Sequence, residues 1–166
     1  RGLDRHPVEL SDPTAVRWLE ACLWPDVPGR VERFRFAVDQ QSLDPPTVVA
    51  GDMVDDLPAV VDAAFADAPD DAHLVAMSSW ALTYVDRARR PEVATTLATV
   101  ASGGRPVTWL TAEPPKCTPG VTPPPERPED RGQTTVLATR TWRAGAERPP
   151  EVLGTSHPHG EWVAFR

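Results

Sequence analysis

The chain has 166 residues, a formal net charge of -7, 40% hydrophobic residues and 20 prolines. This length suits one domain of about 100–200 residues and allows a sizeable core. No apolar run approaches the roughly 18 residues of a membrane span, and no signal-peptide pattern follows Arg1. Net acidity without basic and aromatic clusters disfavours nucleic acid and anionic membrane as partners, and neither is expected. Cys22 and Cys117 suggest neither a disulfide framework nor a zinc module. We therefore expect a cytoplasmic protein.

The first part of the sequence predicts a strand end followed by two helices. Gly2–Asp4 is typical of the end of a strand. Asp12 stands just before Pro13 as an N-cap acid, and apolar residues at three-to-four spacing then predict a helix over 13–24. A second apolar stripe predicts a helix over 31–41.

Strands and helices alternate in the middle of the sequence. The β-branched run at 47–51 lies between prolines and Asp52, which predicts a strand buried on both faces of a parallel sheet. Apolar spacing further along the chain predicts strands at 73–77 and 106–111, and helices at 57–66 and 91–102. This alternation indicates right-handed crossovers and a parallel sheet.

The composition changes in the last third of the chain. Nine prolines fall within 114–150, most of them in 114–131, which predicts a proline-rich loop or lid. The β-rich run at 134–142 and a terminal strand at 161–165 predict an antiparallel pair. The sequence thus predicts a single α/β domain over 1–166, with parallel early strands and an antiparallel end.

Acids follow two of the predicted strands directly, at Asp4 and Asp52. This order resembles the later part of a class I S-adenosylmethionine-dependent methyltransferase. The segments RGLDRHPVELSDP, WLEACLWPD, PTVVAGDMVDDLP, SSWALTYV and RPVTWLTAE resemble, more closely, a bacterial family of uncharacterised proteins, domain of unknown function 2332. The resemblance covers almost the whole chain. It implies a Rossmann-like, methyltransferase-type three-layer fold whose sheet is mostly parallel with an antiparallel C-terminal strand pair, and S-adenosylmethionine as cofactor.

In that family the first strand and its glycine-rich loop lie upstream of the position of Arg1, and no GxGxxG occurs in these residues. We therefore expect this chain to be the later part of a larger methyltransferase-like domain. A sheet that begins at its second strand exposes an unpaired apolar edge. That edge predicts either a homo-oligomer or an N-terminal segment that covers it.

The resemblance implies cofactor-binding roles for four residues. Asp4 would accept hydrogen bonds from both ribose hydroxyls, and the alternative is a surface turn acid. Asp52 would contact the adenine amino group with Met53 packed on the ring, and the alternative for Asp52 is a capping acid. Ser78 follows the next strand and either contacts the cofactor or caps the turn.

The substrate side is predicted at Ser79, Trp80 and Glu113, because open α/β sheets bind ligands at the carboxyl ends of their strands. Glu113 would orient an acceptor amine or hydroxyl, or else pair with an arginine. Met77 stands where better-matched family members are expected to have a histidine, so no catalytic residue is assigned. No GxSxG elbow supports a serine hydrolase.

Two functions remain open. The leading hypothesis is an S-adenosylmethionine-dependent methyltransferase in which alignment of the reactants provides most of the catalysis, so the sequence does not reveal the acceptor. The alternative is a non-catalytic or degenerate Rossmann-like domain that acts through protein-protein contact. A metal site is not expected, because no nearby Cys or Asp completes a ligand set with His157 and His159.

Overall fold

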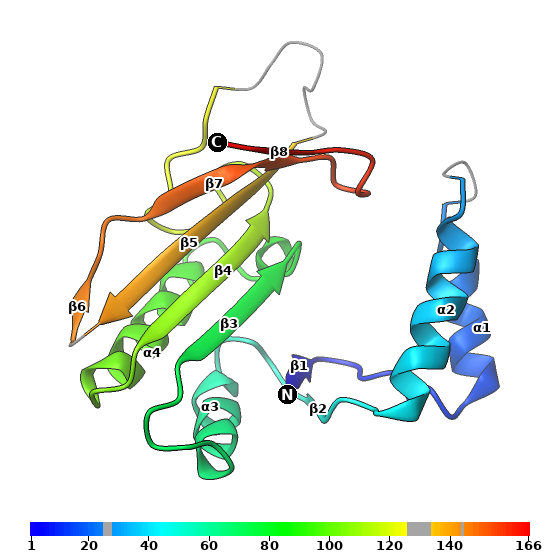
Figure 1. Cartoon of the computed structure of the whole chain (residues 1–166), viewed down its shortest axis with the longest axis horizontal. Helices are drawn as coiled ribbons and strands as arrows, with labels where there is room; N and C mark the ends of the chain where they lie inside the picture. The colour runs from blue at the N-terminus through cyan, green and yellow to red at the C-terminus, as the bar shows by residue number, and fades with distance from the viewer. Residues whose placement is uncertain (25–27, 126–133, 144) are drawn as a thin grey trace. The chain divides into compact units, whose positions relative to one another are not determined.

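The computed structural model describes residues 1–24, 28–125, 134–143 and 145–166. The chain divides into two compact units, Arg1–Asp56 and Leu57–Arg166, and each unit has its own β-sheet (Figure 1). Both units combine helices with strands, so the predicted mixed α/β class is confirmed. The predictions of one domain over 1–166, and of a larger domain to which it belongs, stay predictions.

The first unit consists of a two-stranded ribbon and a pair of helices. Its elements are β1 (Gly2–Asp4), α1 (Pro13–Ala21), α2 (Arg30–Leu43) and β2 (Val48–Ala50). The Asp12 carboxylate accepts a hydrogen bond from Thr14 N at 2.8 Å, which confirms the predicted N-cap. The two helices contact each other, and Arg35 forms two hydrogen bonds to the Glu20 carboxylate between them, at 2.6 and 3.0 Å.

The ribbon of the first unit is parallel but not buried. Leu3 lies opposite Val49, and the two strands make a sheet of their own. Val48 and Val49 keep 41% and 39% of their surface exposed. The prediction of a strand buried on both faces is therefore wrong for β2, because its pairing within the described residues is with β1 alone and the ribbon has no further strand on either side.

The second unit is built around a six-stranded sheet. In chain order its elements are α3 (Leu57–Ala66), β3 (Leu74–Ser79), the 3-10 turn η1 (Leu82–Tyr84), α4 (Arg90–Ser102), β4 (Val107–Glu113), β5 (Thr135–Arg143), β6 (Ala146–Glu147), β7 (Glu151–Ser156) and β8 (Val163–Phe165). The strand order is β3-β4-β5-β7-β8, with β6 paired to β5. β3 and β4 are parallel, and every later pairing is antiparallel.

The antiparallel end of the sheet is larger than the predicted strand pair. β5 and the terminal β8 do not pair with each other, because β7 lies between them. β7 follows two prolines and contains Gly154, which weakens its strand pattern in the sequence. A Cβ at Gly154 would lie 2.1 Å from the carbonyl oxygen of Ala164 on β8, so glycine permits this close approach.

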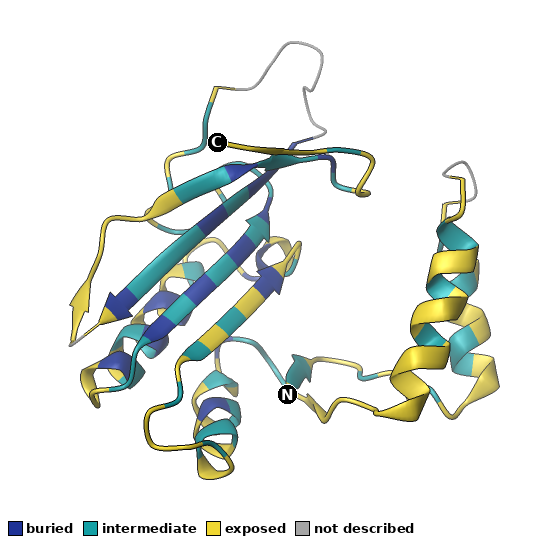
Figure 2. Ribbon diagram, in the orientation of Figure 1, coloured by how far each residue is buried: buried dark blue, intermediate teal, exposed yellow. Residues whose placement is uncertain are grey.

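The core of the second unit lies on one face of its sheet. Side chains alternate along β4, where Val107 and Trp109 are buried and Thr108 and Leu110 are only half-buried. α4 contacts β4 and β5 on the buried side and contributes the fully buried Leu97 (Figure 2). The other face of the sheet carries mostly half-buried and exposed residues, with Thr135 as a buried exception.

Two further features bear on function. Residues 114–125 of the proline-rich loop form no helix or strand, and 126–131 lie outside the described residues. Among the helices that the structure describes, none combines the length and apolar character needed to cross a membrane.

Candidate functional site

The first unit brings two predicted cofactor-binding acids to one end of its ribbon. β1 and β2 run parallel with Asp4 opposite Ala50, so both strands end at the same edge. The N–H of Gly51 extends the pairing by donating to the Asp4 carbonyl at 2.9 Å. A Cβ on Gly51 would lie 2.8 Å from Leu3 Cδ1, so the absence of a side chain at Gly51 allows the ends of β1 and β2 to lie this near each other. Asp4 and Asp52 therefore stand at a carboxyl-end edge, where parallel sheets bind ligands.

The Asp52 carboxylate is held by its neighbours. Its Oδ2 lies 2.5 Å from Arg5 Nη2, and its Oδ1 accepts from Val54 N at 2.8 Å. The hydrogen bond from Arg5, followed by that from the Val54 amide, lowers the pKa of Asp52 below its usual value. Asp52 thus fixes the turn before α3, in which the Asp56 carboxylate also accepts a hydrogen bond from Asp52 N. The alternative of a helix-capping acid stays a prediction, because these bonds reach residues that precede α3.

Asp4 is the more accessible acid of the two. Its side chain is exposed, and Oδ1 accepts a hydrogen bond from His6 N at 2.8 Å. An ionised carboxylate offers about four lone-pair sites, so Asp4 keeps capacity for a ligand hydroxyl. Met53, the predicted adenine contact, is half-buried. Ligand binding by either residue stays a prediction.

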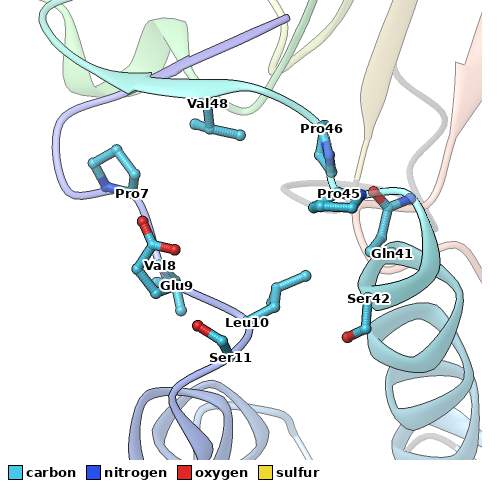
Figure 3. Close-up of a pocket in the computed structure, with 10 residues that line it drawn as sticks. All are labelled: Pro7, Val8, Glu9, Leu10, Ser11, Gln41, Ser42, Pro45, Pro46 and Val48. Atoms are coloured by element: carbon cyan, nitrogen blue, oxygen red, sulfur yellow. The ribbon is translucent and has the colours of Figure 1, made fainter.

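A pocket of about 430 Å³ opens elsewhere in the first unit (Figure 3). Pro7 and Leu10 form part of its apolar wall, and Val48, the first residue of β2, also lines it. Glu9 is the ionisable residue among those that line the pocket. None of the predicted site residues belongs to this lining, so the pocket is separate from the acids at the strand ends.

In the second unit, the chain leaves β3 through a strained turn. Trp80 has a φ of +53°, a left-handed conformation that is rare for a bulky side chain. Its N–H donates to the Ala112 carbonyl at 3.0 Å, and its indole Nε1 donates to Thr135 Oγ1 at 2.9 Å. These bonds connect the turn to β4 and β5. Strain maintained by surrounding contacts is a feature of functional segments.

Glu113, at the end of β4, binds the backbone of this turn through its carboxylate. It is fully buried, and its Oε1 accepts from the N–H groups of Ala81 at 3.2 Å and Leu82 at 3.3 Å. Ser78 also hydrogen-bonds to the Glu113 side chain. The Ser78 hydroxyl in turn accepts from Trp109 Nε1 at 3.2 Å. The carboxylate therefore joins the ends of β3 and β4 to the start of η1.

The protonation of Glu113 depends on two opposing effects. Burial raises its pKa, because the ionised form loses its hydration. The hydrogen bonds from the Leu82 amide and from Ser78 favour the ionised form but are outweighed. A buried acid with a raised pKa at the end of a strand is a recognised feature of functional sites. Full burial and the amide donors give Glu113 a positioning role at this turn, and its predicted contact with an acceptor stays a prediction.

The predicted site residues of this turn differ in how far they are exposed to solvent. Ser79 and Trp80 are exposed, and their contact with a substrate stays a prediction. Ser78 is 5% exposed and its hydroxyl contacts the Trp109 and Glu113 side chains, so its contact with a cofactor and its capping of the turn both stay predictions. The alternative prediction paired Glu113 with an arginine. Arg90 lowers the pKa of Glu113 through its charge, whereas the hydrogen bonds to the carboxylate come from backbone amides.

Three residues of these sites were missed in the sequence: Arg5, Trp109 and Thr135. Arg5 follows Asp4 directly, but its ion pair is with Asp52, which only the pairing of β1 with β2 brings near. Trp109 and Thr135 are alike in this respect, because their polar contacts depend on the register of strands that are far apart in the sequence.

The two histidines near the C-terminus form a local cluster. His159 N donates to His157 Nδ1 at 3.3 Å, and Glu161 lies 3.7 Å from the same nitrogen. In the described ranges of the chain, no group of three or more His, Cys, Asp or Glu side chains is arranged to hold a metal ion. The cluster is best described as part of the turn that leads into β8.

Comparison with known proteins identifies a family. The chain belongs to DUF2332, described as uncharacterized proteins conserved in bacteria, whose family model matches residues 1–165. No curated protein and no solved structure matches the chain.

Proposed function

We propose that this member of the DUF2332 family binds S-adenosylmethionine and transfers its methyl group to an acceptor. The observation that carries the proposal is the parallel β1–β2 ribbon, which ends in the exposed Asp4 and the fixed Asp52. A methyltransferase-type Rossmann-like sheet requires parallel strands with acids at their carboxyl ends. The parallel pairing of β3 and β4 supports the same arrangement.

The groups in the first unit fit the adenosine end of this cofactor. The exposed carboxylate of Asp4 is suited to the two ribose hydroxyls, since a charged acceptor binds neutral donors more strongly than a neutral one does. Asp52 would accept from the adenine amino group, with its orientation set by Arg5. Met53 would pack its thioether against the ring. The sequence contains no glycine-rich turn for the rest of the cofactor, so this assignment covers the adenosine end alone.

When bound, the cofactor supplies an activated methyl group on a sulfonium. The protein's own residues then have mainly to orient the acceptor and exclude water, so a general base is not required. In the second unit, Ser79 and Trp80 are the exposed residues for that task. Glu113 would position these two residues, because its carboxylate accepts hydrogen bonds from the amides of Ala81 and Leu82, which follow them in the turn.

The test is calorimetric titration of S-adenosylhomocysteine into the protein and two variants. We expect saturable binding to the unmodified protein and binding about tenfold weaker or worse to Asp4→Asn, because a hydrogen bond to a charged group is worth about 1.5–3 kcal/mol. Asp39→Asn removes the same charge from α2 of the same unit and should leave affinity unchanged. No binding by the unmodified protein, or equal affinities for both variants, would refute the proposal.

A further inference from the structure

The pocket of the first unit is separate from the acids at the strand ends. Its volume of about 430 Å³ lies within the roughly 300–1,000 Å³ of pockets that bind small molecules. In Figure 3 the segment 7–11 forms one side of the space, and the end of α2 with Pro45 and Pro46 forms the other. All residues that line the pocket lie between 7 and 48, so it belongs to one compact unit.

The backbone around this pocket offers few groups for pairing with another chain. Pro7, Pro45 and Pro46 have no N–H, and the Glu9 carbonyl already accepts a hydrogen bond from Asp12 N at 3.0 Å. An added strand needs a regular series of N–H and C=O groups, so these walls do not favour a further strand of any chain. A ligand of this pocket is therefore recognised by side chains.

The polar side chains of the pocket determine which charge a ligand should have. Glu9 contributes a carboxylate, Ser11 a hydroxyl and Gln41 an amide. Among the described residues that line the pocket there is no arginine or lysine, so the only charge of the lining is negative. Carboxylate, hydroxyl and amide oxygens all accept hydrogen bonds, and an ammonium group has three N–H donors. The complementary polar group is an ammonium ion.

The apolar side chains of the pocket determine the rest of the ligand. Val8 and Val48 have 40% and 41% of their surface exposed, and Figure 3 shows the Leu10 side chain directed into the space between the two sides. Removing such surface from water is favourable. A bare inorganic cation would leave these side chains in water, whereas an ammonium ion with a hydrocarbon body would cover them.

We propose that this pocket binds a small organic ammonium ion, whose N–H groups donate to Glu9 and whose apolar body packs against Val8, Leu10 and Val48. One ion pair at a surface changes affinity by about two- to fivefold. The charge therefore selects the ligand, and the apolar body contributes the larger share of the affinity. Binding in this pocket does not depend on the proposed cofactor.

The first test compares three probes of similar shape and different charge: phenethylammonium, 2-phenylethanol and 3-phenylpropionate. Each is titrated into the protein while the backbone amide signals are followed by NMR. The ammonium should saturate, shift the amides of Leu10 and Val48, and bind about two- to fivefold more tightly than the alcohol. The carboxylate should bind most weakly. No saturable binding of the ammonium, shifts confined to other parts of the chain, or a preference for the carboxylate would overturn the proposal.

The second test assigns the preference to single side chains. Glu9→Gln keeps the length of the side chain without its charge, so the ammonium and the alcohol should bind it about equally. Glu32→Gln removes an exposed carboxylate of α2 that does not line the pocket, and should keep the preference of the unmodified protein. Leu10→Ala should weaken both probes to the same extent.

Amide signals outside the pocket show that each variant is folded. A preference for the ammonium that persists in Glu9→Gln, or that is lost in Glu32→Gln, would refute the role of Glu9. Unchanged affinities in Leu10→Ala would refute the packing of the apolar body.

Discussion

The Glu113 carboxylate accepts hydrogen bonds from the turn after β3, so replacing Glu113 should destabilise the second unit. In Glu113→Gln the side-chain carbonyl can still accept from Ala81 N and Leu82 N, but the amide group that replaces the other oxygen loses its hydrogen bond with the N–H of Leu82, because two donors repel. The loss of one hydrogen bond to a charged or partly charged acceptor predicts about 1.5–3 kcal/mol. Glu113→Ala leaves both amides unsatisfied and should cost about 2–6 kcal/mol.

Urea unfolding measures this effect as a change in midpoint at constant slope. Glu92→Gln is the matched control, because Glu92 is exposed and pairs with Arg89 at the surface, so its replacement should change stability by less than about 1 kcal/mol. If Glu113→Gln and Glu92→Gln have the same small effect, Glu113 does not hold the turn and this reasoning is refuted.

The stability difference between the unmodified protein and Glu113→Gln should also depend on pH. Burial raises the pKa of Glu113, so the folded protein binds its proton more tightly than the unfolded chain does. The stability contributed by the protonated form is therefore present below the unfolded value of about 4.5 and is lost as pH rises through the higher folded value. The difference in unfolding free energy between the unmodified protein and Glu113→Gln should decrease over that interval. A difference that increases with pH would show that the hydrogen bonds outweigh burial.

Two further predictions concern the other described contacts. Arg5 lowers the pKa of Asp52, so the unmodified protein should lose stability relative to Asp52→Asn as pH falls below about 3.8 through the lower folded value; a flat difference would exclude the ion pair. Gly154→Ala should cost about 3 kcal/mol or more because the added Cβ meets the Ala164 carbonyl. Gly160→Ala, with φ +76° but open space around its Cβ, should cost only about 1–2 kcal/mol, and equal costs would refute the clash.

Local signals in the sequence predicted most elements. α3 has the predicted bounds of 57–66, and the N-cap at Asp12 marks the start of α1. Helical spacing and capping are set by residues within a few positions of one another, so a single sequence contains them. The predicted helix over 13–24 ends earlier, at Ala21, with the Cys22 N–H still bonded to carbonyls of α1.

Long-range pairing was not predictable in the same way. β7 was missed because a strand interrupted by Gly154 has little periodicity, although β5 and β8 both pair with it. The predicted burial of β2 was wrong because a β-branched run does not reveal how many strands will pair beside it in the sheet. The strand-end acids were found by spacing, whereas the network at Glu113 required the register that places Ser78 beside β4.

The most direct test of the cofactor assignment compares S-adenosylhomocysteine with its analogue lacking the ribose 2′-hydroxyl, each titrated into the unmodified protein and into Asp4→Asn. We predict that removing the hydroxyl weakens binding to the unmodified protein by about tenfold, as expected for one hydrogen bond to a carboxylate. In Asp4→Asn the two ligands should bind with nearly equal affinity. The same loss in both proteins, or none in either, would contradict recognition of the ribose by Asp4.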